Sequence, residues 1–290
     1  MAKMLVRADD LGYSEAFNYG LARAVKSGIV RSVGVMPNME WAEHGVRLLD
    51  GTDVIFTVHA NICQGRPITD PKLIPSLVDE NGEYLSANKL LVLLYYYLTH
   101  YRGWKGPCVR NNSTTHLLDR VAADFGEVCY EVPVGFKHVS GKMNETNAVI
   151  GGESSGGMAV KGHIPGKDGI YAAALLVEML AVTGKSVSEL YREIVETYGE
   201  LSYEEASLKF DPARRAALKK TVYEDRATPD FGREAERITF GDGCKVVFTD
   251  GSWVICRFSG TEPLLRIAAE GNTKEQAQSY VRAWKEFLEI

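Results

Sequence analysis

Apolar residues recur along this chain in two spacings, one typical of strands and one typical of helices. In the first part, short apolar runs alternate with longer stretches in which apolar residues return every three or four positions. Strands are expected at 4–6, 29–36 and 54–58, and helices at 14–28 and 41–49. This strand–helix–strand order predicts parallel strands joined by right-handed crossovers.

Charged side chains follow two of these predicted strands. Asp9 and Asp10 come after the first strand, and His59 follows the third. The carboxyl ends of parallel strands meet at one edge of a sheet, so we expect the three side chains to lie close together. One imidazole and two carboxylates suit a divalent ion such as zinc, with one aspartate left to act as a base. A capped strand end with a structural histidine is the alternative, and spacing alone favours it.

The middle of the chain repeats the α/β rhythm. Ser86 is expected to cap a helix through residue 100, whose tyrosines at 95–97 are interpreted as core rather than as a surface that stacks on a sugar. Further strands are expected at 106–110 and 128–132, and further helices at 113–125, 170–180 and from the cap at 185–188 to 198. The helix at 170–180 is strongly apolar, which places it in the core.

The last part has an antiparallel pattern, because its strands are separated by short turns such as Gly241-Asp-Gly243 and Asp250-Gly251. The charged stretch 204–212 is interpreted as a linker. Helices are expected at 212–223 and 273–288, and strands at 237–240, 245–248, 253–257 and 264–270. The expected fold class is therefore α/β, with parallel βαβ layers followed by a small α+β domain whose antiparallel sheet is flanked by helices. The expected domains are 1–78, 79–200 and 201–290.

Composition narrows the possible partners. The 290 residues suffice for about two domains, and a net charge of −5 argues against nucleic acid as the main partner. The five cysteines never stand in Cys-x-x-Cys spacing, which favours reduced thiols over a disulfide frame or a zinc site. The longest apolar run, 90–98, is half a membrane span, and no signal peptide is evident. We expect a cytoplasmic protein with no membrane segment.

The most informative string is Arg257-Phe-Ser-Gly-Thr-Glu-Pro263, which joins two apolar strands. Arg257 offers a fork of donors to a phosphate, and Arg266 supplies a second guanidinium just beyond the loop. The hydroxyls of Ser259 and Thr261 add donors, and Gly260 lets backbone N–H groups approach an anion. The alternative is a polar hairpin turn with a solvated arginine.

A second string, Gly151-Gly-Glu-Ser-Ser-Gly-Gly157, suits a sugar. Glu153 can accept hydrogen bonds from ring hydroxyls, Ser155 can donate or accept, and the glycines would allow close approach of the backbone. Lys137, which ends Val134-Gly-Phe-Lys137, completes the predicted sugar-binding set. Loop flexibility alone is the alternative on composition.

Both strings resemble the phosphohexomutases, the phosphoglucomutase/phosphomannomutase family. The resemblance runs from Val78-Asp-Glu-Asn-Gly-Glu-Tyr84 to the end of the chain, and it also covers Lys161-Gly-His-Ile-Pro-Gly-Lys-Asp-Gly169. It implies the family's third and fourth domains, a hexose phosphate as ligand, Arg257 and its loop on the phosphate, and Glu153 and Ser155 on the sugar. Family members transfer the phosphate through a phosphoserine, with Mg²⁺ held by an Asp-x-Asp-x-Asp loop. Neither Thr-Ala-Ser-His-Asn-Pro nor that aspartate string occurs in this sequence.

The beginning of the chain resembles a different family, the YdjC-type carbohydrate deacetylases. The likeness rests on five strings, Ala8-Asp-Asp-Leu-Gly-Tyr-Ser14, Asn18-x-Gly20, Gly28-Ile-Val30, His59-x-Asn61 and Gly65-Arg-Pro67. It implies a metal-dependent deacetylase in which Asp10 and His59 bind Zn²⁺ or Mg²⁺ and Asp9 is the base. The resemblance stops near residue 80, and no later His-rich segment offers the family's third ligand.

These two resemblances lead to the hypothesis that the chain is a chimera, joined within 76–84. Three functions are compatible with it: a sugar-phosphate-binding relative of the mutases that is inactive alone, a deacetylase with an incomplete site, or a non-catalytic chimera. Hydrophobic edges left at the join would favour a homo-oligomer.

Overall fold

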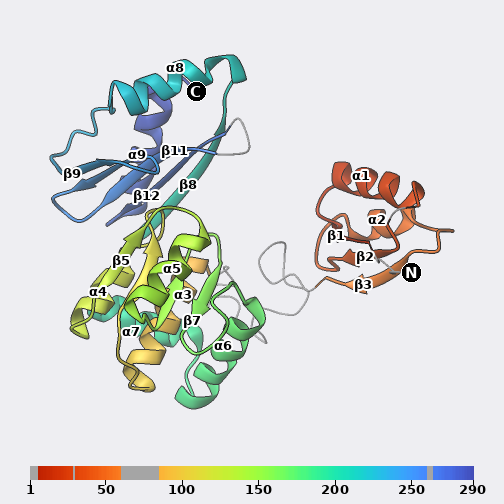
Figure 1. Cartoon of the computed structure of the whole chain (residues 1–290), viewed down its shortest axis with the longest axis horizontal. Coiled ribbons are helices and arrows are strands. Elements are labelled where there is room, and N and C mark those ends of the chain that lie inside the picture. The colour runs from red at the N-terminus through yellow and green to blue at the C-terminus, as the bar shows by residue number, and fades with distance from the viewer. Residues whose placement is uncertain (1–5, 29, 60–84, 260–263) are drawn as a thin grey trace. The chain divides into compact units, whose positions relative to one another are not determined.

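The computed structural model describes residues 6–28, 30–59, 85–259 and 264–290, which form two compact units, Met1–Tyr84 and Leu85–Ile290. Each unit has its own hydrophobic core. Both contain strands and helices, so the α/β class is confirmed (Figure 1). The segment expected to join the two resemblances, 76–84, lies outside the described residues.

The first unit is a three-stranded parallel sheet in the order β1-β2-β3, with two helices. Its elements are β1 (Arg7–Leu11), α1 (Glu15–Lys26), β2 (Ser32–Val35), α2 (Ala42–Leu48) and β3 (Ile55–Val58). The expected βαβαβ order is confirmed, and the Ser14 side chain caps α1 by accepting from the Phe17 N–H, as the sequence suggested.

The first strand lies later than expected. Within the predicted range 4–6 only Val6 is described, and it precedes β1. Arg7 and Asp9 therefore belong to the strand instead of following it. Alternation places the Arg7 and Asp9 side chains on the more exposed face and Ala8 toward the core, and the irregularity between Ala8 and Leu11 brings Leu11 into the core as well.

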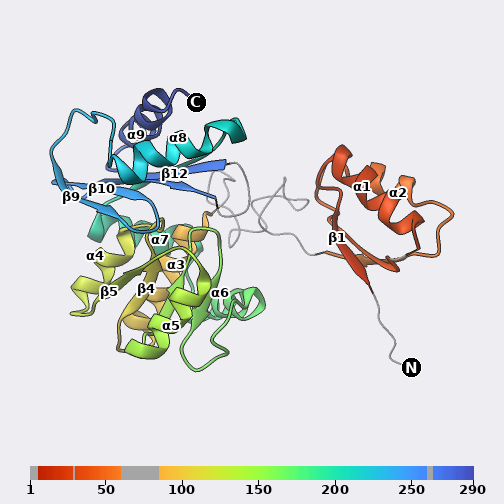
Figure 2. The ribbon, with the colours of Figure 1, turned by 45° about the horizontal axis from the view of Figure 1, so that its top comes forward.

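The second unit begins with a four-stranded sheet in the order β5-β4-β6-β7, covered by helices on both faces (Figures 1 and 2). One face packs on α5, through Val139 and Met143, and the other packs on α3, α4, α6 and α7. Its strands are β4 (Cys108–Asn111), β5 (Cys129–Val132), β6 (Ile150–Gly152) and β7 (Met158–Val160). Its helices are α3 (Ala87–Tyr96) with its π-helical extension η2 (Tyr97–Tyr101), α4 (Leu117–Asp124), α5 (Phe136–Thr146), α6 (Gly169–Thr183) and α7 (Val187–Tyr198).

Several predictions for this region hold. Tyr95 and Tyr97 are at most 1% exposed, so the tyrosine run is core, as interpreted. Cys108 is a buried free thiol, and Cys129, its partner in the register of β4 and β5, is also free. Ser186 and Glu189 form a capping box at the start of α7, in which each side chain accepts from the other residue's backbone N–H.

Other predictions for this region were wrong. The helix expected at 113–125 begins only at Leu117, because the Asn111 side chain holds Ser113 and Thr114 in a turn. Helix α5 and strands β6 and β7 were not predicted. Helix α6 is only partly core, since Ile170 is 85% and Val177 65% exposed.

The rest of the second unit is an antiparallel sheet in the order β8-β12-β11-β10-β9, flanked by helices. Its elements are β8 (Ser202–Lys209), η3 (Pro212–Arg214), α8 (Arg215–Lys219), η4 (Lys220–Glu224), β9 (Ala235–Phe240), β10 (Cys244–Phe248), β11 (Trp253–Phe258), β12 (Leu264–Gly271) and α9 (Lys274–Phe287). The predicted strands and closing helix are confirmed. The predicted linker at 204–212 was wrong, because Ser202–Lys209 pairs with β12 along its whole length.

Among the described residues, no single helix is long and apolar enough to cross a membrane. Only α6 and α7 taken together reach that length and composition, with a bend of 82° between them.

Candidate functional site

A cleft of about 260 Å³ lies between the two parts of the second unit. Glu153, Ser155 and Lys167 line it from the parallel-sheet part, and Glu205, Arg257 and Arg266 line it from the antiparallel sheet. Four residues predicted at two distant strings, Glu153, Ser155, Arg257 and Arg266, therefore share one cavity.

The two arginines occupy a direct cross-strand pair. Arg257 on β11 stands opposite Arg266 on β12 in the antiparallel register, and both line the cleft. Like charges in this position destabilise a sheet unless an anion compensates them. Two neighbouring guanidinium groups offer the planar donor geometry that suits a phosphate.

On the other side of the cleft, Glu153 is 5% exposed and held by three donors. Its Oε1 accepts from Asn111 Nδ2 at 3.2 Å and from the Gly135 N–H at 3.1 Å. Its Oε2 lies 3.0 Å from Lys167 Nζ. The carboxylate is thus fixed at the cleft wall, and a ligand hydroxyl that needs Oε2 has to compete with Lys167.

Lys167 is the main residue of the cleft that sequence reasoning missed. Its Nζ also lies 5.3 Å from the centroid of the Phe136 ring, a cation–π contact. A signal was present in the string Lys161-Gly-His-Ile-Pro-Gly-Lys-Asp-Gly169, but nothing in it gives the distance to Glu153. Asn111, Glu205 and Phe136 also line the cleft and were not predicted.

The glycines around Glu153 have a different task from the one expected. Gly151 and Gly152 lie in strand β6, and a Cβ atom there would meet Val139 Cγ1 at 2.7 Å and Leu91 Cδ1 at 2.7 Å, respectively. They therefore let α5 and α3 pack closely on the two faces of the sheet. Gly156 has a positive φ of 97° in the following turn, and Gly157 makes room for the Lys167 side chain.

The remaining predicted residues are placed as follows. Ser259 is 6% exposed; its N–H donates to the Leu264 carbonyl, and its own carbonyl accepts from Arg215. Gly260 and Thr261 lie outside the described residues. Lys137 is exposed on the first turn of α5 and does not line the cleft, whereas its neighbour Phe136 does.

An ion cluster whose two cations, Lys245 and Arg110, are buried connects the two parts of the second unit. Lys245 of β10 is 2% exposed, and its Nζ lies 2.5 Å from Glu131 Oε2 and 3.0 Å from His116 Nε2. Arg110, also buried, pairs with both Glu131 and Asp119. Glu270 accepts from the His116 N–H and from the Trp253 indole.

Burial changes the protonation of this cluster. It lowers the pKa of Lys245 to about 8, with a further contribution from the positive charge of Arg110. It lowers the pKa of His116 to about 3, so this imidazole is neutral near pH 7. Burial alone would raise the pKa of Glu131, but the neighbouring His116, 3.7 Å away, and the positive charges of Lys245 and Arg110 outweigh it and lower that pKa.

In the first unit, Asp9, Asp10 and His59 come together, as predicted. His59 Nδ1 lies 3.2 Å from Asp10 Oδ1 and 3.9 Å from Asp9 Oδ1. Gly34 of β2 makes room for them, because a Cβ atom there would meet Asp9 and His59. Asp9 pairs with Arg7 at 2.6 Å, and the Asp10 N–H lies 3.3 Å from His59 Nδ1.

This set does not complete a metal site within the described part of the chain. A catalytic zinc keeps three protein ligands, whereas Asp10 and His59 supply two, and no cluster of three or more His, Cys, Asp or Glu residues suited to a metal occurs among the described residues. The Asp10 N–H also points at His59 Nδ1. A metal that bound His59 through this nitrogen would have to displace that contact.

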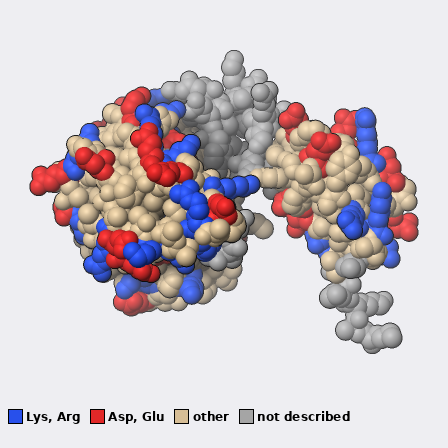
Figure 3. Space-filling view, turned by 90° about the horizontal axis from the view of Figure 1, so that it is seen from above, with Lys and Arg blue, Asp and Glu red and all other residues tan. Residues whose placement is uncertain are grey.

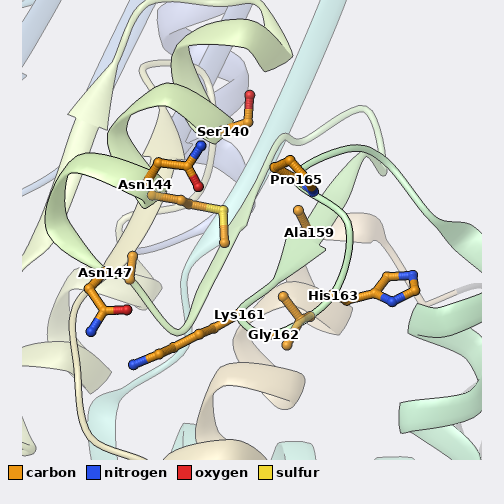
Figure 4. A pocket seen from close by; sticks show the side chains of 11 residues that line it. Ser140, Asn144, Asn147, Ala159, Lys161, Gly162, His163 and Pro165 are labelled. Carbon is orange, nitrogen blue, oxygen red and sulfur yellow. The ribbon is translucent and has the colours of Figure 1, made fainter.

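A second pocket of the second unit, of about 200 Å³, is shown in Figure 4. Asn144 and Asn147, from α5 and its end, face Lys161 and Pro165, from the segment after β7. The imidazole of His163 points away from this pocket (Figure 4). The face of the molecule shown in Figure 3 carries interspersed basic and acidic residues and no continuous basic surface.

The fold and the cleft define a class: a helix-covered mixed sheet followed by a helix-flanked antiparallel sheet, with two arginines and a carboxylate loop in one cleft. Residues 86–198 match the family described as phosphoglucomutase/phosphomannomutase, alpha/beta/alpha domain III, and residues 204–286 match its C-terminal domain. This part of the chain belongs to the phosphoglucomutase/phosphomannomutase family. Residues 3–102 match the YdjC-like proteins, further than the expected end near residue 80 and overlapping the mutase match at 86–102.

Individual proteins repeat this division. The phosphoglucomutase/phosphomannomutase of Thermococcus kodakarensis is 31% identical over 212 residues, 73% of this chain and 44% of that protein. The phosphoglucosamine mutase of Rubrobacter xylanophilus is 30% identical over 68% of this chain and 41% of its own length. A carbohydrate deacetylase of Geobacillus stearothermophilus is 43% identical over 89 residues, 30% of this chain and 35% of that protein. The chain thus spans less than half the length of these relatives.

Solved structures agree on the fold. A phosphoglucomutase/phosphomannomutase family protein from Burkholderia thailandensis has a TM-score of 0.59 at 19% identity, covering 89% of this chain and 60% of that one. The Paramecium phosphoglucomutase parafusin has a TM-score of 0.55 at 24% identity, covering 72% of this chain and 41% of that one.

Proposed function

We propose that the chain binds a hexose phosphate in the cleft of its second unit. The observation that carries this proposal is the cross-strand pair Arg257 and Arg266, which faces the buried carboxylate of Glu153 across one cavity. The arginines supply donors for the phosphate, and Glu153 and Ser155 accept from and donate to sugar hydroxyls. The assignment of Ser259, Gly260, Thr261 and Lys137 to the same ligand stays a prediction.

Lys167 takes part in this binding. It neutralises Glu153 while the cleft has no ligand, and its ammonium can turn to an anionic group when sugar hydroxyls occupy the carboxylate. Arg257, Arg266 and Lys167 exceed Glu153 and Glu205 by one positive charge in the cleft, which favours an anionic ligand.

We propose further that the chain alone does not transfer the phosphoryl group. Phosphoryl transfer needs an in-line nucleophile and charge stabilisation, usually with a metal. The sequence contains neither the Thr-Ala-Ser-His-Asn-Pro string nor the aspartate string that hold the phosphoserine and Mg²⁺ in the mutases. A partner that carries these parts would complete the site.

The binding test is a calorimetric titration with glucose 1-phosphate and mannose 1-phosphate. Arg257→Ala should weaken binding roughly thirty-fold, since a hydrogen-bonded charge contributes about 2 kcal/mol. Arg237→Ala is the matched control, because Arg237 is exposed on β9, an edge strand of the same sheet, and does not line the cleft. Equal affinities of the Arg257 variant and the wild type would refute the assignment. A mutase assay with glucose 1,6-bisphosphate should show no turnover.

A second candidate function is metal-dependent deacetylation in the first unit, favoured by the meeting of Asp9, Asp10 and His59 at one end of its sheet. Acetate release from an acetylated chitooligosaccharide, measured with and without Zn²⁺ or Mg²⁺, tests it. Metal-dependent release that disappears in Asp9→Asn would establish this activity, and its absence would leave the cleft as the functional site.

A cytoplasmic location and a homo-oligomeric state are also proposed. The free thiols of Cys108, Cys244 and Cys256 support a reducing compartment. Exposed aliphatic side chains on α6, such as Ile170 and Val177, support self-association, which sedimentation at several concentrations would detect.

A further inference from the structure

The segment between β7 and α6 brings Lys167 into the cleft. Contacts between side chains of this segment and the start of α6 hold the segment in a loop. His163 Nε2 lies 2.7 Å from Asp168 Oδ2 across five positions of the sequence. The His163 ring also stacks on the Tyr171 ring, with centroids 4.1 Å apart and planes at 10°. The start of the segment is thereby fastened to the first turn of α6.

Asp168 connects this contact to the helix. Its Oδ1 accepts from the Tyr171 N–H at 3.0 Å, so the carboxylate caps α6 with one oxygen and binds His163 with the other. The hydrogen bond from His163, followed by the one from the Tyr171 N–H, lowers the pKa of Asp168. An ionised Asp168 only accepts, so the hydrogen of this contact belongs to His163 Nε2.

Lys167 precedes Asp168 directly, and its side chain runs in a narrow path. A Cβ atom at Gly157 would meet Lys167 Cε at 2.5 Å, so the stem lies against the backbone of the loop that carries Glu153. The ammonium then reaches Glu153 Oε2 at 3.0 Å, with the Phe136 ring beside it. A lysine side chain is otherwise free to rotate, and half of this one, 51%, is exposed.

We propose that His163 is a positioning residue, which acts through Asp168 to hold Lys167 across the loop of Glu153 so that its ammonium is ready for an anionic sugar ligand. His163 itself does not contact the ligand, since it does not line the cleft. The contribution of His163 is to lower the entropy that Lys167 loses on binding. The ligand in this inference rests on the proposed function. The placement of Lys167 by His163 does not depend on it.

The ligand-dependent test is a double-mutant cycle. Affinity for glucose 1-phosphate is measured by calorimetry for the wild type, His163→Ala, Lys167→Ala and the double variant. We expect His163→Ala to weaken binding roughly five-fold, the effect of about one hydrogen bond, and His163→Gln to restore it because its amide N–H can donate to Asp168. In the Lys167→Ala background, His163→Ala should change the affinity less than two-fold. Equal losses in both backgrounds would show that His163 does not act through Lys167, and no loss in either would overturn the proposal.

A ligand-free test separates this inference from the proposed function. Acetylation of Lys167 by a dilute amine reagent is followed by mass spectrometry, with Lys142 as internal reference. We expect His163→Ala to raise the rate at Lys167 several-fold, because the ion pair with Glu153 protects the ammonium, and His163→Gln to restore the wild-type rate. His100→Ala, which removes an exposed imidazole from η2, should change neither rate. A wild type that binds no sugar phosphate would refute the proposed function alone. The role of His163 would be refuted if His163→Ala left the labelling rate of Lys167 unchanged.

Discussion

Glu131 is the residue on which the buried cations of the ion cluster converge. It faces Lys245 at 2.5 Å and Arg110 at 2.7 Å, and both cations are at most 3% exposed. Burying two cations is unfavourable unless an anion compensates them with close hydrogen bonds. This single carboxylate therefore connects the two parts that form the walls of the cleft.

Removal of that carboxylate should destabilise the folded protein. We expect Glu131→Ala to lower the free energy of unfolding by about 3 kcal/mol, because Lys245 then lies buried without a carboxylate, while Arg110 keeps Asp119. Glu145→Ala, which removes the exposed partner of Lys142, should change it by less than about 0.5 kcal/mol. Urea denaturation measures both. A change below about 1 kcal/mol for Glu131→Ala would mean that water reaches the cluster.

The neutral imidazole of His116 predicts a dependence of stability on pH. Burial, followed by the charge of Arg110, lowers its pKa from 6.5 to about 3. Between these values the unfolded chain binds a proton at His116 and the folded chain does not, so the free energy of unfolding falls as the pH falls from about 6.5 toward 3.

The wild type and His116→Gln should therefore diverge on acidification. Denaturation between pH 7 and pH 4 should show a steeper loss in the wild type, by up to about 1.4 kcal/mol per pH unit. Parallel curves for the two proteins would show that His116 is protonated in the fold.

At the scale of elements, strand β6 shows why the sequence around Glu153 could be recognised as a motif while the roles of its glycines could not be predicted. The structure places Glu153 and Ser155 in the cleft, and their assignment to a sugar stays a prediction. It assigned Gly151 and Gly152 to the ligand, whereas they face α5 and α3. A glycine needed for a ligand and one needed for helix packing look alike in a sequence, since both simply lack a side chain.

This distinction can be tested with two alanine variants of nearby glycines. Gly152→Ala places Cβ 2.7 Å from Leu91 Cδ1 in a closed core and should lower the free energy of unfolding by about 2 kcal/mol. Gly157→Ala meets only the flexible end of Lys167, so we expect near-normal stability and weaker binding of glucose 1-phosphate. Thermal unfolding measures the stability of the two variants, and calorimetry measures their affinity for glucose 1-phosphate. Equal stability and equal affinity in both variants would contradict the different roles given to Gly152 and Gly157.

Strand β8 is the opposite case. Its residues Glu204, Glu205 and Lys209 suggested a solvated linker, yet the whole segment pairs with β12. Charges are tolerated there because β8 is an edge strand. Strands β10, β11 and β12 were predicted correctly, since their central residues are buried and apolar.

At the scale of the molecule, the two units have separate cores. Leu11, Val33 and Leu49 belong to the core of the first unit, and none of the described core residues of the second unit joins them. The second unit contains both walls of the proposed cleft, so its ligand binding should not depend on the first.

We therefore expect residues 85–290, expressed alone, to unfold cooperatively and to bind glucose 1-phosphate with the affinity of the full chain. Residues 1–84 alone should be marginal, because β3 exposes Ile55 and Val58, 61% and 75% respectively, and a small sheet with apolar side chains exposed has little core. Circular dichroism and calorimetry on the two fragments check this. A second unit that fails to fold alone would refute the division.

The sequence by itself determined the α/β class, the order of most elements, the two family resemblances and the strings that carry Glu153, Arg257 and Arg266. These follow from local periodicity and from side-chain chemistry, which a string of residues records. Only the tertiary structure decided that Arg257 and Arg266 stand in one cross-strand pair, that Lys167 reaches Glu153, and that Lys245 and Glu131 meet in one ion cluster. Such contacts depend on strand register and on the packing of distant elements, and no local pattern in the chain encodes the distance between them.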